Sequence, residues 1–145
     1  MSDDDGFQWQ ADRFADVRVL RFRVPGFEAL DLQTRKLAYH LTEAALSGRD
    51  ITWDQNYRHN LVIRRTLEAI DAAWQGPRSE AFDTYLKRVW FSQGIHHHAS
   101  TRKFLPEFSR EDFRGWLARC EADALPLADG QTPGALGDWL EPILF

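Results

Sequence analysis

Hydrophobic and polar residues near the N-terminus follow a pattern typical of a β-strand. The run from Val17 to Val24 is rich in β-branched and aromatic residues, and it ends at Pro25-Gly26, a turn signal. This pattern predicts a strand over residues 17–24. No second strand is predicted anywhere in the chain, so the backbone groups of this strand would lack partners. We therefore expect either an extended arm or a strand whose partners lie in another polypeptide segment.

Beyond this strand, apolar residues recur at spacings of three and four, the period of an amphipathic helix. The pattern predicts one helix over residues 31–47 and a second that follows Asp54 as its N-cap and reaches about residue 74. Later helices are expected to start at Ser79, at Ser109 and at Thr132-Pro133, and Pro142 should limit the last one. Short connections favour antiparallel packing of these helices.

The predicted fold is therefore mainly α: a small antiparallel helical domain with one N-terminal strand. Residues 1–16 are expected to be an acidic, mobile N-terminus, and residues 17–145 a single helical domain. A length of 145 residues, with 43% hydrophobic and 28% charged residues, allows one packed core. The chain has 6 Trp and 10 Phe, and we expect some of these rings at an interface.

Charge and composition argue against several functions. The net charge of -4 argues against nucleic-acid binding, and no apolar run approaches the roughly 20 residues needed to span a bilayer. The acidic N-terminus lacks the features of a secretory signal, so a soluble, cytoplasmic protein is expected. Cys120 is the single cysteine, which excludes an internal disulfide, and its place on an apolar helix face predicts a core residue.

Three of the 5 histidines stand in a row, at His96, His97 and His98, directly after Gly94-Ile95. Neutral imidazoles are good metal ligands, but consecutive side chains of an extended backbone point to opposite faces. Only His96 and His98 could then share a face. Three interpretations stay open: a metal site, a polar loop whose imidazoles bond to the backbone, and contact with a ligand or peptide in a cleft.

Other catalytic signatures are missing from the sequence. No Glu follows any His, so there is no His-Glu-x-x-His element, and there is neither a Gly-x-Ser-x-Gly elbow nor a glycine-rich phosphate loop. We therefore assign no catalytic residue, no metal ligand and no cofactor to this chain. The candidate substrate-binding residues are Gly94, Ile95, His96, His97 and His98.

An ordered set of segments spans most of residues 17–113. It comprises Val24-Pro25-Gly26-Phe27, residues 36–51, Asp54-Gln55-Asn56-Tyr57, Asn60-Leu61, residues 63–68, residues 89–98 and residues 103–108. The most telling is Val-Trp-Phe-Ser-Gln-Gly-Ile-His-His-His at residues 89–98. In this order the segments resemble the N-terminal part of the bacterial dipeptidyl peptidase III family. Relatives often have Asn where Gln93 stands and an aromatic residue where Ala99 stands, which weakens any substrate contact at position 99.

The resemblance implies a two-lobed zinc exopeptidase that removes dipeptides from the N-termini of short peptides. In that family a His-Glu-x-x-Gly-His helix and a glutamate from a second helix hold the zinc, and both come after the region matched here. Zinc is therefore implied for a full-length relative and not for this chain. The resemblance further implies that residues 17–24 belong to a β-barrel and that Gly94–His98 lead to the wall of the peptide cleft. The expected partners are short peptides and the catalytic lobe.

Three hypotheses follow from these observations. The chain could be a cleft-forming part of such a peptidase without catalysis of its own, which predicts an exposed apolar face and an unpaired strand. It could instead be a stand-alone helical module that binds peptides or proteins without enzymatic activity. The third hypothesis is a small metal-binding protein that uses His96 and His98.

Overall fold

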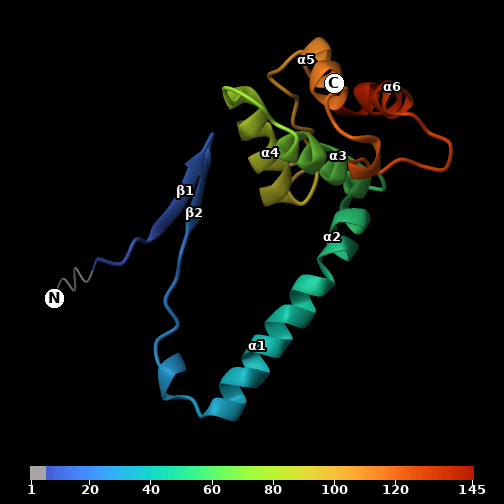
Figure 1. Ribbon diagram of the computed structural model, residues 1–145. Helices are drawn as coiled ribbons and strands as arrows, with labels where there is room; N and C mark the ends of the chain where they lie inside the picture. The colour runs from blue at the N-terminus through green and yellow to red at the C-terminus, as the bar shows by residue number, and fades with distance from the viewer. Residues whose placement is uncertain (1–5) are drawn as a thin grey trace. The chain divides into compact units, whose positions relative to one another are not determined.

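A computed structural model describes residues 6–145 and gives a mainly α fold with one small antiparallel sheet, which confirms the predicted fold class (Figure 1). Contacts divide the chain into two compact units, the first ending at Gly48 and the second spanning Arg49–Phe145. The sequence predicts a boundary at residue 16 and one domain after it. The chain instead divides at Gly48, and residue 16 lies within the first unit.

The first unit contains a β-hairpin formed by β1 (Gln10–Phe14) and β2 (Val17–Leu20). The strands pair antiparallel, with Phe14 opposite Val17 across the turn. The strand predicted over residues 17–24 therefore ends with β2, and the expectation that it has no partner within the chain is wrong. β1 has the sequence QADRF, which contains no apolar run, so the hydrophobic pattern gives no indication of this strand.

The hairpin is followed by a 3-10 turn, η1 (Phe27–Ala29), and by the long helix α1 (Leu32–Ser47). The side chain of Asp31 caps α1, because its Oδ1 accepts hydrogen bonds from the backbone N–H of Gln33 at 2.8 Å and of Thr34 at 3.0 Å. Hydrogen bonds from Thr34, first from its side chain, hold the pKa of Asp31 below its usual value. The helix stops at Gly48, and the prediction over residues 31–47 is confirmed.

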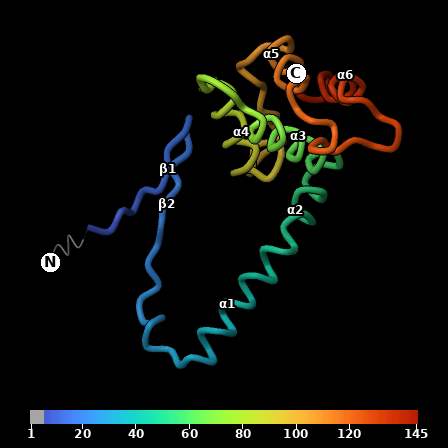
Figure 2. The backbone as a smooth tube through the Cα atoms, in the orientation of Figure 1, coloured from blue at the N-terminus to red at the C-terminus, as the bar shows by residue number. Residues whose placement is uncertain are grey.

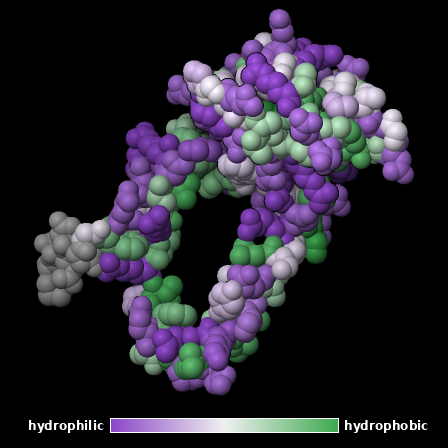
Figure 3. Space-filling view, viewed as in Figure 1, coloured by the Kyte–Doolittle hydropathy of each residue, from purple (hydrophilic) through white to green (hydrophobic). Residues whose placement is uncertain are grey.

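The first unit has no buried side chain among its described residues, 6–48. The apolar positions that predicted α1 are open to solvent, with Leu37 exposed to 59% and Leu41 to 61%. Hydrophobic residues are visible on the surface of the α1 segment in the space-filling view (Figure 3). The hydrophobic period of α1 therefore marks an exposed apolar stripe and not a core.

The second unit begins with α2 (Arg49–Asn56) and α3 (Asn60–Ala72). The sequence predicts a single helix after Asp54 over this region, and that prediction is wrong in two respects. The helical backbone already starts at Arg49, and it is interrupted between Asn56 and Asn60. The interruption is a turn in which the backbone N–H of Asn60 donates to the Tyr57 carbonyl at 2.9 Å.

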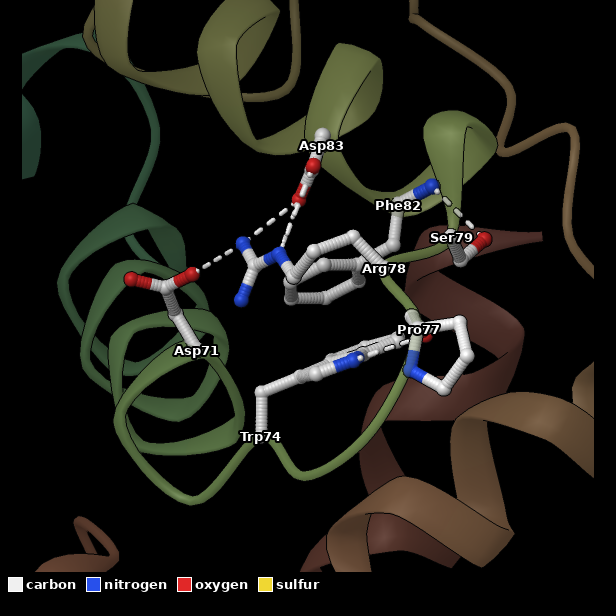
Figure 4. A network of polar contacts seen from close by, with 7 residues as sticks. All are labelled: Asp71, Trp74, Pro77, Arg78, Ser79, Phe82 and Asp83. Atoms are coloured by element: carbon white, nitrogen blue, oxygen red, sulfur yellow. Dashed lines mark hydrogen bonds and ion pairs between the residues drawn. The ribbon is translucent and has the colours of Figure 1, made fainter.

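Arg78 and Trp74 stabilise the connection between α3 and α4 (Glu80–Ser92) (Figure 4). The Arg78 guanidinium pairs with Asp71 of α3 and Asp83 of α4. Its hydrogen bonds to these carboxylates raise its pKa, and those that Asp83 accepts contribute most. Trp74 stacks on the ring of Phe82 with centroids 5.1 Å apart. As predicted, Ser79 caps α4; its hydroxyl accepts from the Phe82 N–H at 3.3 Å.

The last part of the second unit contains α5 (Arg110–Leu117), the turn η2 (Ala122–Ala124) and α6 (Pro133–Leu144), joined by irregular backbone (Figure 2). Ser109 and Asp112 form the predicted capping box at the start of α5. Thr132 caps α6 as expected. Pro142 does not limit this helix, because in the last turn it removes only one hydrogen bond.

The core lies within the second unit and is built from side chains of α2 to α6 and from Ile95 between α4 and α5. Cys120 belongs to it and is 8% exposed, as predicted. The helix face expected for Cys120 is wrong, because α5 ends at Leu117 and Cys120 lies in the turn that follows. The side chains sealed most completely are Phe82, Phe113, Ile63, Leu67, Ile70, Leu86, Ile95, Leu136, Leu140, Leu144 and Val89. In the part of the chain that the structure describes, no helix is long and apolar enough to cross a membrane.

Candidate functional site

A pocket of about 300 Å³ opens in the second unit beside the C-terminal end of α4. The residues that line it share small or hydrogen-bonding side chains. They are Asn56, Asn60, Ser92, Gly94, His96, His97, His98, Ser100 and Thr101. The structure thus brings four of the five predicted site residues to one cavity and adds five polar residues that sequence reasoning had not selected.

The end of α4 sets the direction in which the histidine segment leaves the helix. Gln93 adopts the left-handed conformation with φ 52°, and the Gly94 N–H donates to the Val89 carbonyl at 3.0 Å. Gly94 has φ 152°, which side chains rarely tolerate. A Cβ at this position would also lie 2.6 Å from Cγ of Asn60. Both the backbone conformation and the neighbouring carboxamide therefore require glycine here.

Asn60 holds three backbone segments together beneath the pocket. Its side chain is 1% exposed, and its Nδ2 donates to the carbonyl oxygens of Trp53 at 3.2 Å and Gln93 at 3.3 Å. Its Oδ1 accepts from the Ile95 N–H at 3.3 Å. Asn56 Nδ2 also donates to the Gln93 carbonyl, at 3.3 Å. No local sequence signal indicates this role, because the burial of Asn60 follows from how the helices pack.

Ile95 differs from the other four predicted site residues. Its side chain is 1% exposed and belongs to the hydrophobic core, and Ile95 is not among the residues that line the pocket. Its backbone carbonyl accepts from the Phe104 N–H at 2.8 Å. Ile95 therefore anchors the segment to the core, while its neighbours on both sides face the pocket.

The histidine segment forms one side of a short, closed loop. A β-bridge pairs His96 with Lys103, and the His97 N–H donates to the Arg102 carbonyl at 2.8 Å. The chain turns back between them, with the Ala99 N–H donating to Nδ1 of His97 at 3.2 Å. With Nδ1 accepting this bond, a neutral His97 carries its proton on Nε2 and can donate from there.

The three imidazoles do not alternate between faces as an extended backbone would require. His97 and His98 stack on each other with centroids 4.4 Å apart, and Phe91 meets His98 edge-on at 5.2 Å. The expectation that only His96 and His98 share a face is therefore wrong, because the backbone turns after the bridge at His96. The stacked imidazoles of His97 and His98 consequently line the pocket together, and Phe91 packs against the ring of His98.

A second aromatic group lies behind His96. Tyr57 contacts His96 edge-on at 5.2 Å and His59 at 5.0 Å, and His59 in turn meets Trp139 of α6 at 4.9 Å. Burial, and then the nearby positive charge of Arg58, lower the pKa of His59. These rings connect the turn between α2 and α3 to the C-terminal helix, so they support the pocket from below.

The arrangement does not fit a metal site. Among residues 6–145, no group of three or more His, Cys, Asp or Glu side chains is placed to hold a metal ion. Nδ1 of His97 already accepts a backbone hydrogen bond, so this nitrogen is not available as a ligand. The zinc implied by the family resemblance therefore has no site among the described residues.

Another cavity, of about 440 Å³, is lined by Arg49, Trp53, Arg64, Glu68, Trp90 and Gln93. Its polar groups are largely committed to each other. Arg64 pairs with Glu68 at 2.8 Å and with Asp50 at 2.7 Å, and Glu68 also accepts from the Trp90 indole at 3.1 Å. These partners, Glu68 first, raise the pKa of Arg64. The histidine pocket is the stronger candidate because the side chains of four of its lining residues make no hydrogen bond within the described chain: Ser92, His96, His98 and Thr101.

The sequence matches no protein-family model, and no curated protein is similar to it. The structural observations that bear on function are therefore the pocket and the exposed surface of the first unit.

Proposed function

We propose that this chain forms the N-terminal, cleft-forming part of a zinc metallopeptidase similar to dipeptidyl peptidase III, and that its histidine pocket contacts the peptide substrate. The observation that carries the proposal is the pocket itself. Gly94 and His96–His98, which stand in the most telling segment of the resemblance, all line it. A cytoplasmic location is part of the same proposal.

The chemistry of the pocket suits a peptide. A peptide backbone offers one donor and one acceptor at each residue, and imidazole, hydroxyl and carboxamide groups can serve both. The stacked rings of His97 and His98 add a flat aromatic surface for an apolar side chain. The network around Asn60 holds these groups in place before any ligand arrives, which lowers the entropic cost of binding.

The exposed surface of the first unit supports a place within a larger assembly. Leu37 and Leu41 leave an apolar stripe on α1 open to solvent, and monomeric proteins rarely expose such stripes. The sheet of β1 and β2 also has only two strands among the described residues, so a further strand could be added at either edge. A catalytic lobe that covers α1 and adds strands to the hairpin would remove both features.

In this proposal the chain binds and orients the peptide, and the catalytic lobe supplies the reaction. The sequence contains no His-Glu-x-x-Gly-His element, so we assign the hydrolytic step outside this chain. The histidines position the substrate by hydrogen bonds and ring contacts. Contacts of this kind bind the substrate and the transition state equally well. They therefore lower KM and leave kcat nearly unchanged.

A second candidate function is a stand-alone module that binds peptides without catalysis. It is favoured by the second unit, Arg49–Phe145, which contains the whole buried core. A self-contained core of this kind can fold without a catalytic lobe. The two candidates share the pocket and differ only in whether the protein that contains this chain cleaves the peptide.

The test compares dipeptide release by this chain with release by the longest reading frame that contains it, using a chromogenic dipeptidyl substrate with added zinc. We expect activity only in the longer protein, and there His97→Ala should raise KM by roughly tenfold with little change in kcat. Asp129→Ala, an exposed residue of the second unit that does not line the pocket, serves as the control. A longer protein without activity would favour the binding module, and an unchanged KM in His97→Ala would contradict the role of the pocket.

A further inference from the structure

Ser92, the last residue of α4, has a free hydroxyl although the residue is only 6% exposed. Several helical hydroxyls donate to the carbonyl four residues earlier, as in Ser47 at 2.9 Å and Thr66 at 2.8 Å. Ser92 makes no hydrogen bond of this kind within residues 6–145. Two other polar groups, Trp53 Nε1 and the Tyr85 hydroxyl, also lack a partner, but both are fully buried. The Ser92 hydroxyl, in contrast, is accessible to solvent. The Ser92 hydroxyl therefore faces the pocket that the residue lines.

Other polar groups around Ser92 are also uncommitted. Nε2 of His97, the rings of His96 and His98 and the Thr101 hydroxyl make no hydrogen bond to any part of the described chain. Each of these groups is uncharged in the neutral form, and together they provide both donors and acceptors. A ligand in this pocket therefore meets several unsatisfied hydrogen-bonding groups at once.

The lining contains no Asp, Glu, Lys or Arg. Two basic groups near the pocket have other partners: Lys103 Nζ donates to the Ile143 carbonyl at 3.1 Å, and Arg58 Nε donates to His59 at 3.0 Å. Arg102, on the same loop, is exposed and is not among the lining residues. A charged ligand group that entered the pocket would lose its hydration shell and would meet no group of opposite charge. Such desolvation without a compensating ion pair is unfavourable. The two ends of a free peptide are such groups.

We infer that the pocket takes an uncharged, internal segment of peptide backbone and that it excludes the charged amino and carboxyl ends. This inference rests on the proposed function, since it names the part of a peptide that the pocket recognises. The volume of about 300 Å³ corresponds to roughly ten water molecules at about 30 Å³ each, which suits a short segment. The charged end of the substrate must then be recognised by groups outside this pocket.

The test compares N-acetyl-trialanine amide with uncapped trialanine, using the purified full chain. Binding is followed at pH 7 through the ring C–H signals of the histidines in NMR titrations. We expect the capped peptide to bind at least about fivefold more tightly than uncapped trialanine, whose carboxylate is charged and whose amino group is mostly charged at this pH. Ser92→Ala should weaken the capped peptide by roughly three- to tenfold, the effect of one hydrogen bond.

Ser47→Ala is the matched control, because its hydroxyl bonds to the Glu43 carbonyl of its own helix. Thermal melts of both variants check that they fold. Tighter binding of the uncapped peptide, or equal binding by wild type and Ser92→Ala, overturns the inference while leaving peptide binding intact. If neither peptide moves the histidine signals, the proposed function fails together with the inference.

Discussion

Asn60 is the residue on which the pocket depends most directly. Its carboxamide is buried and uses both of its polar atoms to connect α2, the end of α4 and the segment that carries the histidines. A buried carboxamide is stable only when its bonds are made, so the three segments can move apart only at the cost of unpaired polar groups. One side chain thus fixes the geometry of a site made from distant parts of the chain.

Gly94→Ala tests how tightly this geometry is held. The new Cβ would overlap the carboxamide of Asn60 and occupy a backbone conformation that alanine disfavours. We expect a loss of about 2–4 kcal/mol in the free energy of unfolding, measured by urea denaturation followed by tryptophan fluorescence. Gly130→Ala is the control: it also has positive φ but open space around it, so a loss of about 1 kcal/mol is expected. Equal losses would show that Asn60 is not close to Gly94 in solution.

At the scale of elements, α5 and α6 are joined by a carboxylate between two guanidinium groups. Glu141 of α6 accepts from Arg110 at 3.0 Å and also pairs with Arg114 of α5. The hydrogen bond from Arg114, and then that from Arg110, lower the pKa of Glu141 from its usual value. The folded chain therefore holds this carboxylate in its ionised form more firmly than the unfolded chain does.

Glu141→Gln should make stability less dependent on pH. Because the pKa of Glu141 is lower in the folded state, its stabilisation is complete above the ordinary value of 4.5 and is lost as the pH falls through the folded-state pKa. We expect the urea midpoint of the wild type to fall between pH 7 and pH 3 by more than that of Glu141→Gln. The exposed Asp129→Asn is the control and should follow the wild type. Parallel acid dependence in all three proteins would count against the pairing.

For the whole molecule, burial is distributed very unevenly. The buried side chains belong to Arg49–Phe145, whereas residues 6–48 contain none. An isolated helix of this length and a two-stranded hairpin are each only marginally stable in water. The second unit therefore accounts for the stability of the fold, and the first unit carries the apolar surface that another polypeptide could cover.

Amide hydrogen exchange should reveal this difference. We expect the amides of α1 and the hairpin to exchange within seconds to minutes, and those of α3 and α4 to be protected by roughly the global unfolding free energy. The fragment Arg49–Phe145 should keep the protection of α3 and α4, which serves as the internal control. Strong protection of α1 in the purified chain would mean that its apolar stripe is already covered, and it would remove one support for a missing lobe.

The sequence by itself determined the features that depend on near neighbours. The caps at Asp31, Ser79 and Ser109, the stop at Gly48 and the start of the last helix are local hydrogen-bond or backbone preferences, so a short window of sequence contains their cause. The period of three and four residues likewise indicated α1 correctly, but it could not tell that the stripe stays exposed.

Tertiary structure alone decided the rest. The polar strand β1 can be recognised only from its pairing with β2. The break between α2 and α3 likewise depends on contacts that Asn60 makes with residues 33 and 35 positions away in the sequence. The pocket likewise joins Asn56, Ser92 and Thr101 with the histidine segment that the sequence had selected. Side chains far apart in sequence meet according to how the helices pack, and no local pattern records that packing.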